Sequence, residues 1–209
     1  MMNTEKRIEK YIRFYHGIMG QKILEKEVEF VDSKLKGCTD ILSVGCGPAY
    51  LETQLQKRHP EIHIRGIDIF SAMLHHAPTE ITVEQGDAQD LPFPDKSFDA
   101  VIFITSLEFI TNIKKAIIEA HRVLKAGGIF LAALLNTKSQ YFKDEYADKK
   151  SYIRQNIKHQ DLNQIIQYIS RYFQIQKREY ILGINKGKLC NTNNPLSASL
   201  CVVYGKKNS

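Results

Sequence analysis

The sequence predicts an α/β protein, a three-layer sandwich in which helices cover both faces of a mostly parallel, seven-stranded sheet. Short apolar runs alternate with stretches of helical spacing from residue 41 to residue 135, and this order joins parallel strands through crossover helices. The run at 98–104 is almost continuously apolar, as a strand buried on both faces requires. The last two apolar runs, 174–184 and 198–204, leave no room for a helix between them. This predicts an antiparallel C-terminal hairpin.

The remaining elements follow from the same periodicity. Strands are expected at 41–44, 62–67, 81–84, 98–104, 129–135, 174–184 and 198–204. Helices are expected at 50–59, 112–125 and 162–173, with a short one through residue 76 that begins with Ser71 as its N-cap. Residues 3–36 predict two helices broken at Gly17 and Gly20, and Gly37 and the pair Gly127-Gly128 mark helix ends. Residues 137–160 show no clear period, and 183–195 is expected to be a loop.

Length and composition favour one globular domain. The chain has 209 residues, of which 43% are hydrophobic and 25% charged, values typical of such a domain. No apolar run reaches the roughly 18–20 residues of a membrane span, and the start of the chain lacks the apolar centre of a secretory signal. The four cysteines, Cys38, Cys46, Cys190 and Cys201, lack the spacing of a metal site or a disulfide framework. We therefore expect a cytoplasmic protein without a metal. A net charge of +6 permits nucleic-acid binding but does not indicate it.

A glycine-rich turn follows the first predicted strand. Gly45, Cys46 and Gly47 stand between that strand and a helix. Glycines there let the backbone turn sharply and approach a ligand, and the helix start presents free amide groups beside it. Tight turns without a ligand use the same pattern, so this motif alone leaves both readings open.

Two aspartates follow the next two strands. Asp68 ends the second strand, 21 residues after Gly47, where a carboxylate accepts hydrogen bonds from the two hydroxyls of a ribose. Asp87 and Ala88 follow the third strand, where a carboxylate and a backbone amide read the edge of an adenine ring. Their alternative roles are a helix cap for Asp68 and an ordinary turn for Asp87. Because these strand ends converge on one crevice in an open α/β sheet, the three features together predict an adenosine-containing ligand.

The sequence disfavours ligands that carry phosphates. A dinucleotide fingerprint has a third glycine where this chain has Tyr50, and no Gly-Lys-Ser/Thr sequence for a nucleotide triphosphate is present. S-adenosylmethionine (SAM) carries adenosine without a phosphate and therefore fits better.

Four segments in order resemble motifs of the class I SAM-dependent methyltransferases, a Rossmann-like family. The nearest branch is the small-molecule group that includes ubiquinone- and menaquinone-biosynthesis-like enzymes. The segments are 41–49 (ILSVGCGPA), 66–74 (GIDIFSAML), 86–99 (GDAQDLPFPDKSFD) and 119–128 (EAHRVLKAGG), and Ser106-Leu107-Glu108 is a further match. The resemblance is continuous from about residue 41 to residue 135 and weaker on either side.

The resemblance implies roles for individual residues. Gly45 and Gly47 would lie under the methionine part of SAM, Asp68 would bind the ribose, and Ile69 would pack on the adenine. Asp87 and Ala88 would read the adenine edge, and the backbone near Ile104 would face the methionine end. Tyr11 and Tyr15 resemble a lid over the cofactor, with plain helix packing as the alternative. Cys46 and Met73 complete the expected set of cofactor contacts.

The sequence departs from the family pattern at two positions. The family carries an acid where this chain has Ser43, and that acid helps to hold the ammonium group of SAM. Phe109 stands where many relatives have a histidine, which removes the most obvious general base. A methyl on a sulfonium is already a good electrophile, so alignment supplies much of the rate and a base is needed only for some acceptors. The candidates for a base are His159, Tyr141, Glu108 and His16.

The predicted organisation is a single domain with four parts. Residues 1–37 form a helical lid, 38–136 the cofactor-binding core, 137–160 the acceptor-side segment and 161–209 the C-terminal helix and hairpin. The aromatic residues of 137–160 suit an apolar acceptor, whereas Lys138, Lys143, Lys149 and Lys150 suit an anionic one. The predicted function is transfer of a methyl group from SAM to a small molecule, with S-adenosylhomocysteine (SAH) as product. The alternatives are an RNA or protein methyltransferase and a SAM-binding module without catalysis.

Overall fold

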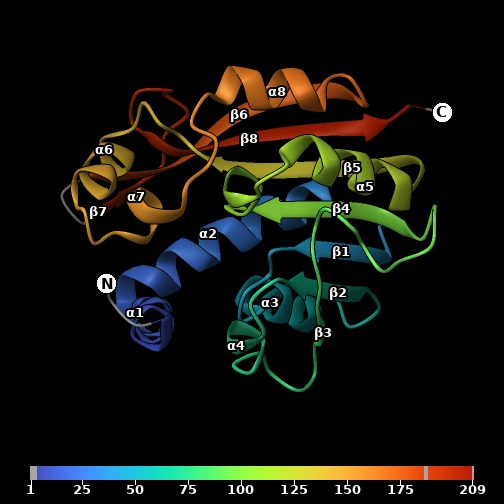
Figure 1. Ribbon diagram of the computed structural model, residues 1–209, viewed down its shortest axis with the longest axis horizontal. Coiled ribbons are helices and arrows are strands. Elements are labelled where there is room, and N and C mark those ends of the chain that lie inside the picture. Colours follow the sequence, from blue (N-terminus) through green and yellow to red (C-terminus); the bar gives the residue numbers. More distant parts are fainter. Residues whose placement is uncertain (1–3, 186–187, 209) are drawn as a thin grey trace.

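The structure, a computed structural model, describes residues 4–185 and 188–208. Its centre is an eight-stranded sheet with the order β3-β2-β1-β4-β5-β8-β6-β7. The first five strands in this order, β3-β2-β1-β4-β5, are parallel to one another. Strand β8 pairs antiparallel with β5 and with β6, and β7 pairs antiparallel with β6. Figure 1 shows the sheet crossing the molecule with helices on both of its faces. The predicted three-layer α/β architecture is confirmed, with one more strand than expected.

The parallel half alternates strands and helices as predicted. Its elements are β1 (Asp40–Val44), α3 (Tyr50–Arg58), β2 (His63–Asp68), α4 (Ser71–Leu74), β3 (Thr82–Gln85), β4 (Phe98–Ile104), the 3-10 helix η1 (Leu107–Phe109), α5 (Ile113–Val123) and β5 (Leu124–Leu135). Strand β4 lies between β1 and β5, and its residues 100–103 are buried. This central position explains why its sequence is almost entirely apolar.

The C-terminal part contains helices where none was expected. It consists of α6 (Gln140–Ala147), α7 (Tyr152–Asn156), α8 (Leu162–Ile169), β6 (Phe173–Asn185), β7 (Lys188–Cys190) and β8 (Ala198–Lys207). Helices α6 and α7 lie within the segment 137–160, where only Phe142 and Ile153 of the two helices are buried. So few buried positions produce no visible period in the sequence. Strand β7 is the eighth strand, and it lies in the predicted loop 183–195.

Two further boundaries differ from the sequence prediction. Ser71 is the first residue of α4 and not its N-cap, which is Phe70. The pair Gly127-Gly128 does not separate α5 from β5, because β5 already begins at Leu124 and contains both glycines. The helix ends at Val123 because Leu124 pairs with Phe98 of β4, so a tertiary contact ends it before the glycines do.

The N-terminal residues form two helices, α1 (Thr4–His16) and α2 (Ile18–Lys34). Gly17 breaks them as predicted, whereas Gly20 lies inside α2. Val28 and Val31 of α2 are buried against the sheet. Helix α2 therefore belongs to the layer that covers the sheet, and within the predicted 1–37 lid only α1 remains a candidate to move.

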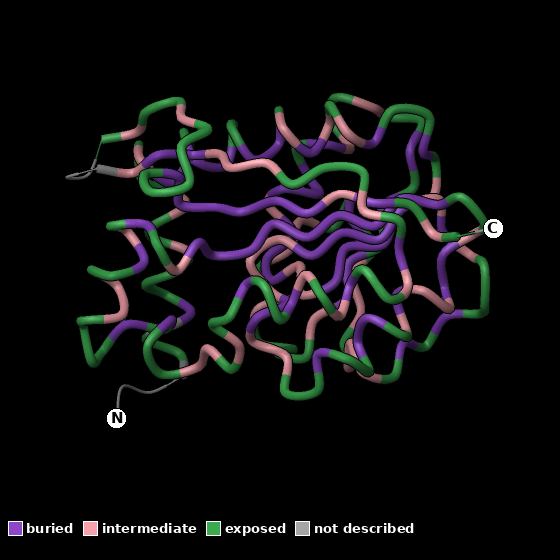
Figure 2. Tube along the Cα trace, turned by 90° about the horizontal axis from the view of Figure 1, so that it is seen from above, coloured by how far each residue is buried: buried purple, intermediate pink, exposed green. Residues whose placement is uncertain are grey.

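Two apolar clusters hold the layers together. Helices α5 and α8 pack on one face of the sheet through residues such as Ile117 and Ile165, and α2 and α3 pack on the other through Val28 and Leu55. Figure 2 shows the sheet as a band of buried chain between more exposed helices. Among the described residues, no helix is long and apolar enough to cross a membrane, and no group of three His, Cys, Asp or Glu side chains could hold a metal ion.

Candidate functional site

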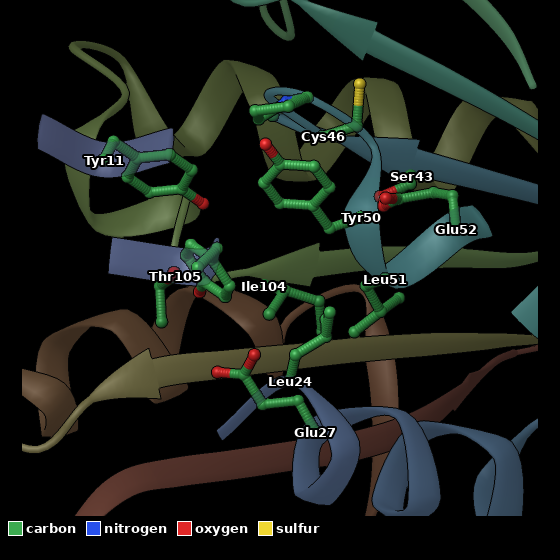
Figure 3. Close-up of a pocket in the computed structure, with 13 residues that line it drawn as sticks. Tyr11, Leu24, Glu27, Ser43, Cys46, Tyr50, Leu51, Glu52, Ile104 and Thr105 are labelled. Atoms are coloured by element: carbon green, nitrogen blue, oxygen red, sulfur yellow. The ribbon is translucent and has the colours of Figure 1, made fainter. Parts of the chain in front are cut away.

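A pocket lies at the carboxyl ends of β1 and β4, beneath the N-terminal helices (Figure 3). Its lining combines residues of α1, α2, β1 with the loop after it, α3, and the end of β4. These residues are Tyr11, Tyr15, Leu24, Glu27, Ser43, Gly45, Cys46, Pro48, Tyr50, Leu51, Glu52, Ile104 and Thr105. Of the predicted cofactor residues, this set includes Tyr11, Tyr15, Gly45, Cys46 and Ile104. Parallel strands bring their carboxyl ends to one edge, which is where open α/β sheets bind ligands.

The glycine-rich turn has two glycines with different roles. Gly45 has φ +75°, and a Cβ on it would lie 2.4 Å from the Cβ of Ser106. Ser106 approaches this closely because its Oγ donates to the carbonyl of Val44 at 2.6 Å, which ties the loop after β4 to the end of β1. Gly47 has φ +55°, and nothing lies within 4 Å of a Cβ built on it. Gly45 therefore permits close packing within the protein, whereas Gly47 leaves open space beside the turn.

The carboxylate of Asp68 is held beside this turn. Its Oδ2 accepts from the amide of Gly47 and its Oδ1 accepts from the amide of Phe70, each at 2.9 Å. Burial raises the pKa of Asp68, and the hydrogen bonds from the backbone amides partly offset that rise. The two amides fix the orientation of the group and leave lone pairs for further donors. The geometry fits two hydroxyl groups of a ribose.

The residues predicted to contact adenine lie outside the pocket, in the loops that follow β2 and β3. Ile69 exposes 54% of its surface and offers a free apolar face. Asp87 accepts hydrogen bonds from the backbone and side-chain amides of Gln89, so its carboxylate also stabilises its own turn. Ala88 and Met73 are half-buried beside these loops. The structure thus places Ile69 and Asp87 directly after the neighbouring strands β2 and β3.

Sequence reasoning missed Glu52, which supplies a carboxylate beneath the turn. It lies in the first turn of α3, is 3% exposed, and its Oε1 accepts a hydrogen bond from Ser43 Oγ. Burial raises the pKa of Glu52 to about 7, which the hydrogen bond from Ser43 partly offsets. The acid absent at position 43 is therefore replaced by one that reaches the same place from the helix. A signal was present in the sequence, because Glu52 stands next to Leu51 and one turn before Leu55 on the inner face of α3.

Glu27 of α2 is the second acid in the lining that sequence reasoning missed. It is 6% exposed, and Figure 3 shows its carboxylate directed into the pocket from the side opposite Glu52. Burial, and then the charge of Glu52, raise the pKa of Glu27 to about 8. The signal in the sequence was its position in the apolar stripe of α2, four residues after Ile23 and four before Val31. Burying a carboxylate without a compensating partner costs stability, so such a group in a pocket is a candidate for a functional residue.

The tyrosines of α1 close the pocket on the outside. The ring centroids of Tyr11 and Tyr15 are 4.9 Å apart, and those of Tyr15 and Tyr50 are 5.7 Å apart. The Tyr50 hydroxyl is 3.2 Å from His16 Nε2, so this histidine holds the rim of the pocket. Both predicted lid tyrosines thus reach the site.

The candidate bases Glu108 and His159 are tied into the framework and do not line the pocket. Glu108 is 1% exposed, and its Oε1 accepts from the amide of Leu135 at 2.8 Å. Its carbonyl accepts from the amides of Lys158 and His159, and His159 Nε2 lies 3.0 Å from the carbonyl of Ile110. These contacts join the loop after β4 to the segment after β5. We therefore assign structural roles to both residues.

Comparisons with known proteins identify the family to which the core of this fold belongs. Residues 42–132 match the model of a methyltransferase domain family. This matched core is that of the class I SAM-dependent methyltransferases, a family in which SAM is the methyl donor.

Relatives found by sequence match a little less than half of this chain. The chain is 36% identical over 93 residues to the uncharacterized methyltransferase YdaC of Bacillus subtilis, which covers 42% of this chain and 51% of the relative. It is 36% identical over 102 residues to a demethylmenaquinone methyltransferase of Symbiobacterium thermophilum, covering 44% and 40%. With a malonyl-[acyl-carrier protein] O-methyltransferase of Dechloromonas aromatica the identity is 33% over 97 residues, covering 46% and 37%. The chain spans about half, or less, of the length of these relatives.

Solved structures extend the likeness to the whole chain. A SAM-dependent methyltransferase of Thermotoga maritima, described as a possible histamine N-methyltransferase, superposes with a TM-score of 0.80 at 20% identity over 98% of both chains. One from Archaeoglobus fulgidus superposes with a TM-score of 0.72 at 18% identity, covering 94% of this chain and 99% of the other. At such identities the likeness establishes the fold.

Proposed function

We propose that this protein transfers a methyl group from SAM to a small molecule. The observation that carries the proposal is the carboxylate of Glu52, buried beneath the glycine-rich turn and oriented by Ser43. A buried acid at the methionine end of the site is suited to the ammonium group of SAM. Because this chain has Ser43 where the family has an acid, strand β1 itself offers no charged partner for that group.

The residues around the turn fit the other parts of SAM. The open space beside Gly47 accommodates the chain of the ligand, and the held carboxylate of Asp68 suits its ribose. Ile69 offers an apolar face for the adenine, and Asp87 with the amide of Ala88 is suited to the adenine edge. Ile104 and Cys46, which line the pocket, complete its methionine end, and we assign Met73 of α4 to the adenine end of the ligand.

SAM, when bound, supplies an electrophilic methyl group, and the protein has to hold and align the reactants. Helix α1 lies over the pocket, so we assign the lid to α1 and the cover of the acceptor to α1, α2 and α6. The other two parts of the domain keep their predicted roles, with 38–136 as the cofactor-binding core and 161–209 as the C-terminal helix and hairpin.

A small acceptor is favoured because the pocket is covered by helices and lined by tyrosines. Relatives described as demethylmenaquinone and fatty-acid methyltransferases point in the same direction. The four cysteines are free, which supports the cytoplasmic location as part of the proposal.

Calorimetric titration with SAM and with SAH tests the proposal. We expect both ligands to bind and Asp68→Ala to weaken each by about 1–3 kcal/mol, because hydrogen bonds to a charged group are lost. Glu61→Ala, an exposed acid before β2, serves as the control and leaves affinity unchanged. If the unaltered protein binds neither ligand, the proposal is wrong. Release of SAH with small acceptors then separates catalysis from simple binding.

A further inference from the structure

Glu27 has no part in the proposed binding of SAM, although it lines the same pocket. Glu52, bonded to Ser43, occupies the side formed by β1 and α3. Glu27 enters from α2 on the other side, with Leu24 and Ile104 lying between the two acids in Figure 3. The two carboxylates therefore face different regions of the pocket, and SAM has only one ammonium group for them.

The neighbours of Glu27 lie on the acceptor side. Burial is the main cause of the raised pKa values of Tyr15 from α1 and Tyr141 from α6, and the nearby charge of Glu27 adds to both. Helix α6 belongs to the segment after β5 that we assign to acceptor binding, and Tyr141 packs in the apolar cluster of this face. Glu27 thus stands where the lid, α2 and the acceptor-side segment meet.

No cation balances Glu27 within the described part of the chain. Burial and Glu52 account for its raised pKa, with neither a hydrogen bond nor a positive side chain to offset them. The lining of the pocket contains two acids and three tyrosines, and no lysine, arginine or histidine among the residues that the structure describes. The four lysines of 137–160 that suggested an anionic acceptor are all exposed and lie outside this lining. With this pKa the Glu27 carboxyl is mostly protonated at neutral pH in the free protein, and a cationic ligand would supply the positive charge that ionises it.

From this arrangement we infer that the methyl acceptor is a small primary or secondary amine, bound as an ammonium ion by Glu27 between the rings of Tyr11 and Tyr15, which line the pocket with it. A carboxylate supplies a charged hydrogen-bond partner, and tyrosine rings attract a cation through their faces. This inference rests on the proposed function and names its substrate class.

The chemistry requires one proton acceptor. An ammonium nitrogen has no free lone pair, so its proton passes to the Glu27 carboxylate before the nitrogen can receive the methyl group. The lone pair then forms the new carbon–nitrogen bond, and the electron pair of the broken carbon–sulfur bond stays on sulfur. A carboxyl group whose pKa burial has raised to about 8 is suited to exchange a proton near neutral pH.

Binding of three matched compounds tests the inference without relying on turnover. Phenethylamine, 2-phenylethanol and 3-phenylpropanoate are titrated into the SAH-loaded protein. We expect the amine to bind at least tenfold more tightly than the alcohol, and the carboxylate to bind most weakly. Glu27→Gln, which preserves size, removes the preference for the amine, and Glu27→Asp retains part of it. Glu25→Gln, an exposed acid on the same helix, leaves the preference intact.

The possible results separate this inference from the proposed function. If the unaltered protein does not bind SAH, the proposed function fails. If it binds SAH but shows no preference for the amine up to the solubility limit, or if Glu27→Gln keeps the preference, the amine assignment alone is overturned. A tenfold loss of SAH affinity in Glu27→Gln also overturns it, because Glu27 would then be a ligand of the cofactor.

Discussion

Ser43 Oγ on strand β1 donates a hydrogen bond to the carboxylate of Glu52 on helix α3, and both residues line the pocket beneath the glycine-rich turn. The family pattern has the acid on the strand itself, at position 43. Here the strand residue is the donor and the helix residue the acceptor. In the proposed function, an acid on helix α3 thus takes the place of the family's acid on the strand.

The first prediction concerns this pair. Glu52→Gln is expected to weaken SAH binding by about 1–3 kcal/mol, because a charged partner of the ammonium group becomes neutral. The double variant Ser43→Asp with Glu52→Ser returns the acid to the strand and restores most of the affinity. Calorimetry with SAH measures both. Unchanged affinity in Glu52→Gln would show that the acid does not face the ligand.

The second prediction compares glycines in the left-handed region. Gly47→Ala is expected to cost about 1–2 kcal/mol of stability from its backbone conformation, and to lower SAH affinity because its Cβ enters the open space beside the turn. Gly45→Ala costs more, roughly 2–4 kcal/mol, because its Cβ also overlaps Ser106. Urea denaturation and SAH titration measure the two effects.

Gly37→Ala is the matched control for this comparison. Gly37 has φ +83° with nothing within 4 Å of a Cβ built on it, and it lies outside the pocket. It should carry the same backbone cost as Gly47→Ala without any loss of SAH affinity. Equal affinities for the Gly37 and Gly47 variants would mean that no ligand passes beside Gly47.

The third prediction concerns pH. Burial raises the pKa of Glu108 to about 7, and the hydrogen bond from Leu135 partly offsets this. The folded state therefore holds the proton more tightly than the unfolded chain, where the ordinary value is 4.5. This contribution to stability is complete below pH 4.5 and is lost as the pH rises to 7 and above.

Glu108→Gln cannot titrate at this position, so its stability should fall less between pH 5 and pH 8. We expect the difference between the variant and the unaltered protein to change by up to roughly 3 kcal/mol across that interval. Chemical denaturation at several pH values measures it. Parallel curves for the two proteins would contradict the raised pKa of Glu108.

The fourth prediction concerns the lid. Tyr11 and Tyr15 of α1 line the pocket, whereas Val28 and Val31 of α2 are buried against the sheet. SAH should therefore slow amide hydrogen exchange in α1 at least tenfold, because the ligand adds contacts to a weakly held helix. Helix α5, packed on the other face, serves as the internal reference. Equal protection of α1 with and without SAH would remove its role as a lid.

Much of the fold follows from local patterns. The run 98–104 and the glycines that follow β1 predicted a central strand and a turn at the correct places, because burial on both faces and positive φ angles constrain residue type directly. Helices α6 and α7 escaped prediction because each is short and buries few residues. The early start of β5 also escaped, since the pairing of Leu124 with Phe98 joins residues far apart in sequence.

The sequence by itself determined the class of the protein and the loops that form its candidate site. The strand period, the turn glycines and the acids at strand ends depend only on residues that are close together in the sequence. Only the tertiary structure decided which acids face the pocket. Glu27 and Glu52 lie on α-helices, and Glu108 lies in the short 3-10 helix η1. Their positions relative to the pocket depend on how helices pack on a sheet, which no local pattern records. Packing thus places Glu108 in the framework, and Glu52 and Glu27 on different sides of the pocket.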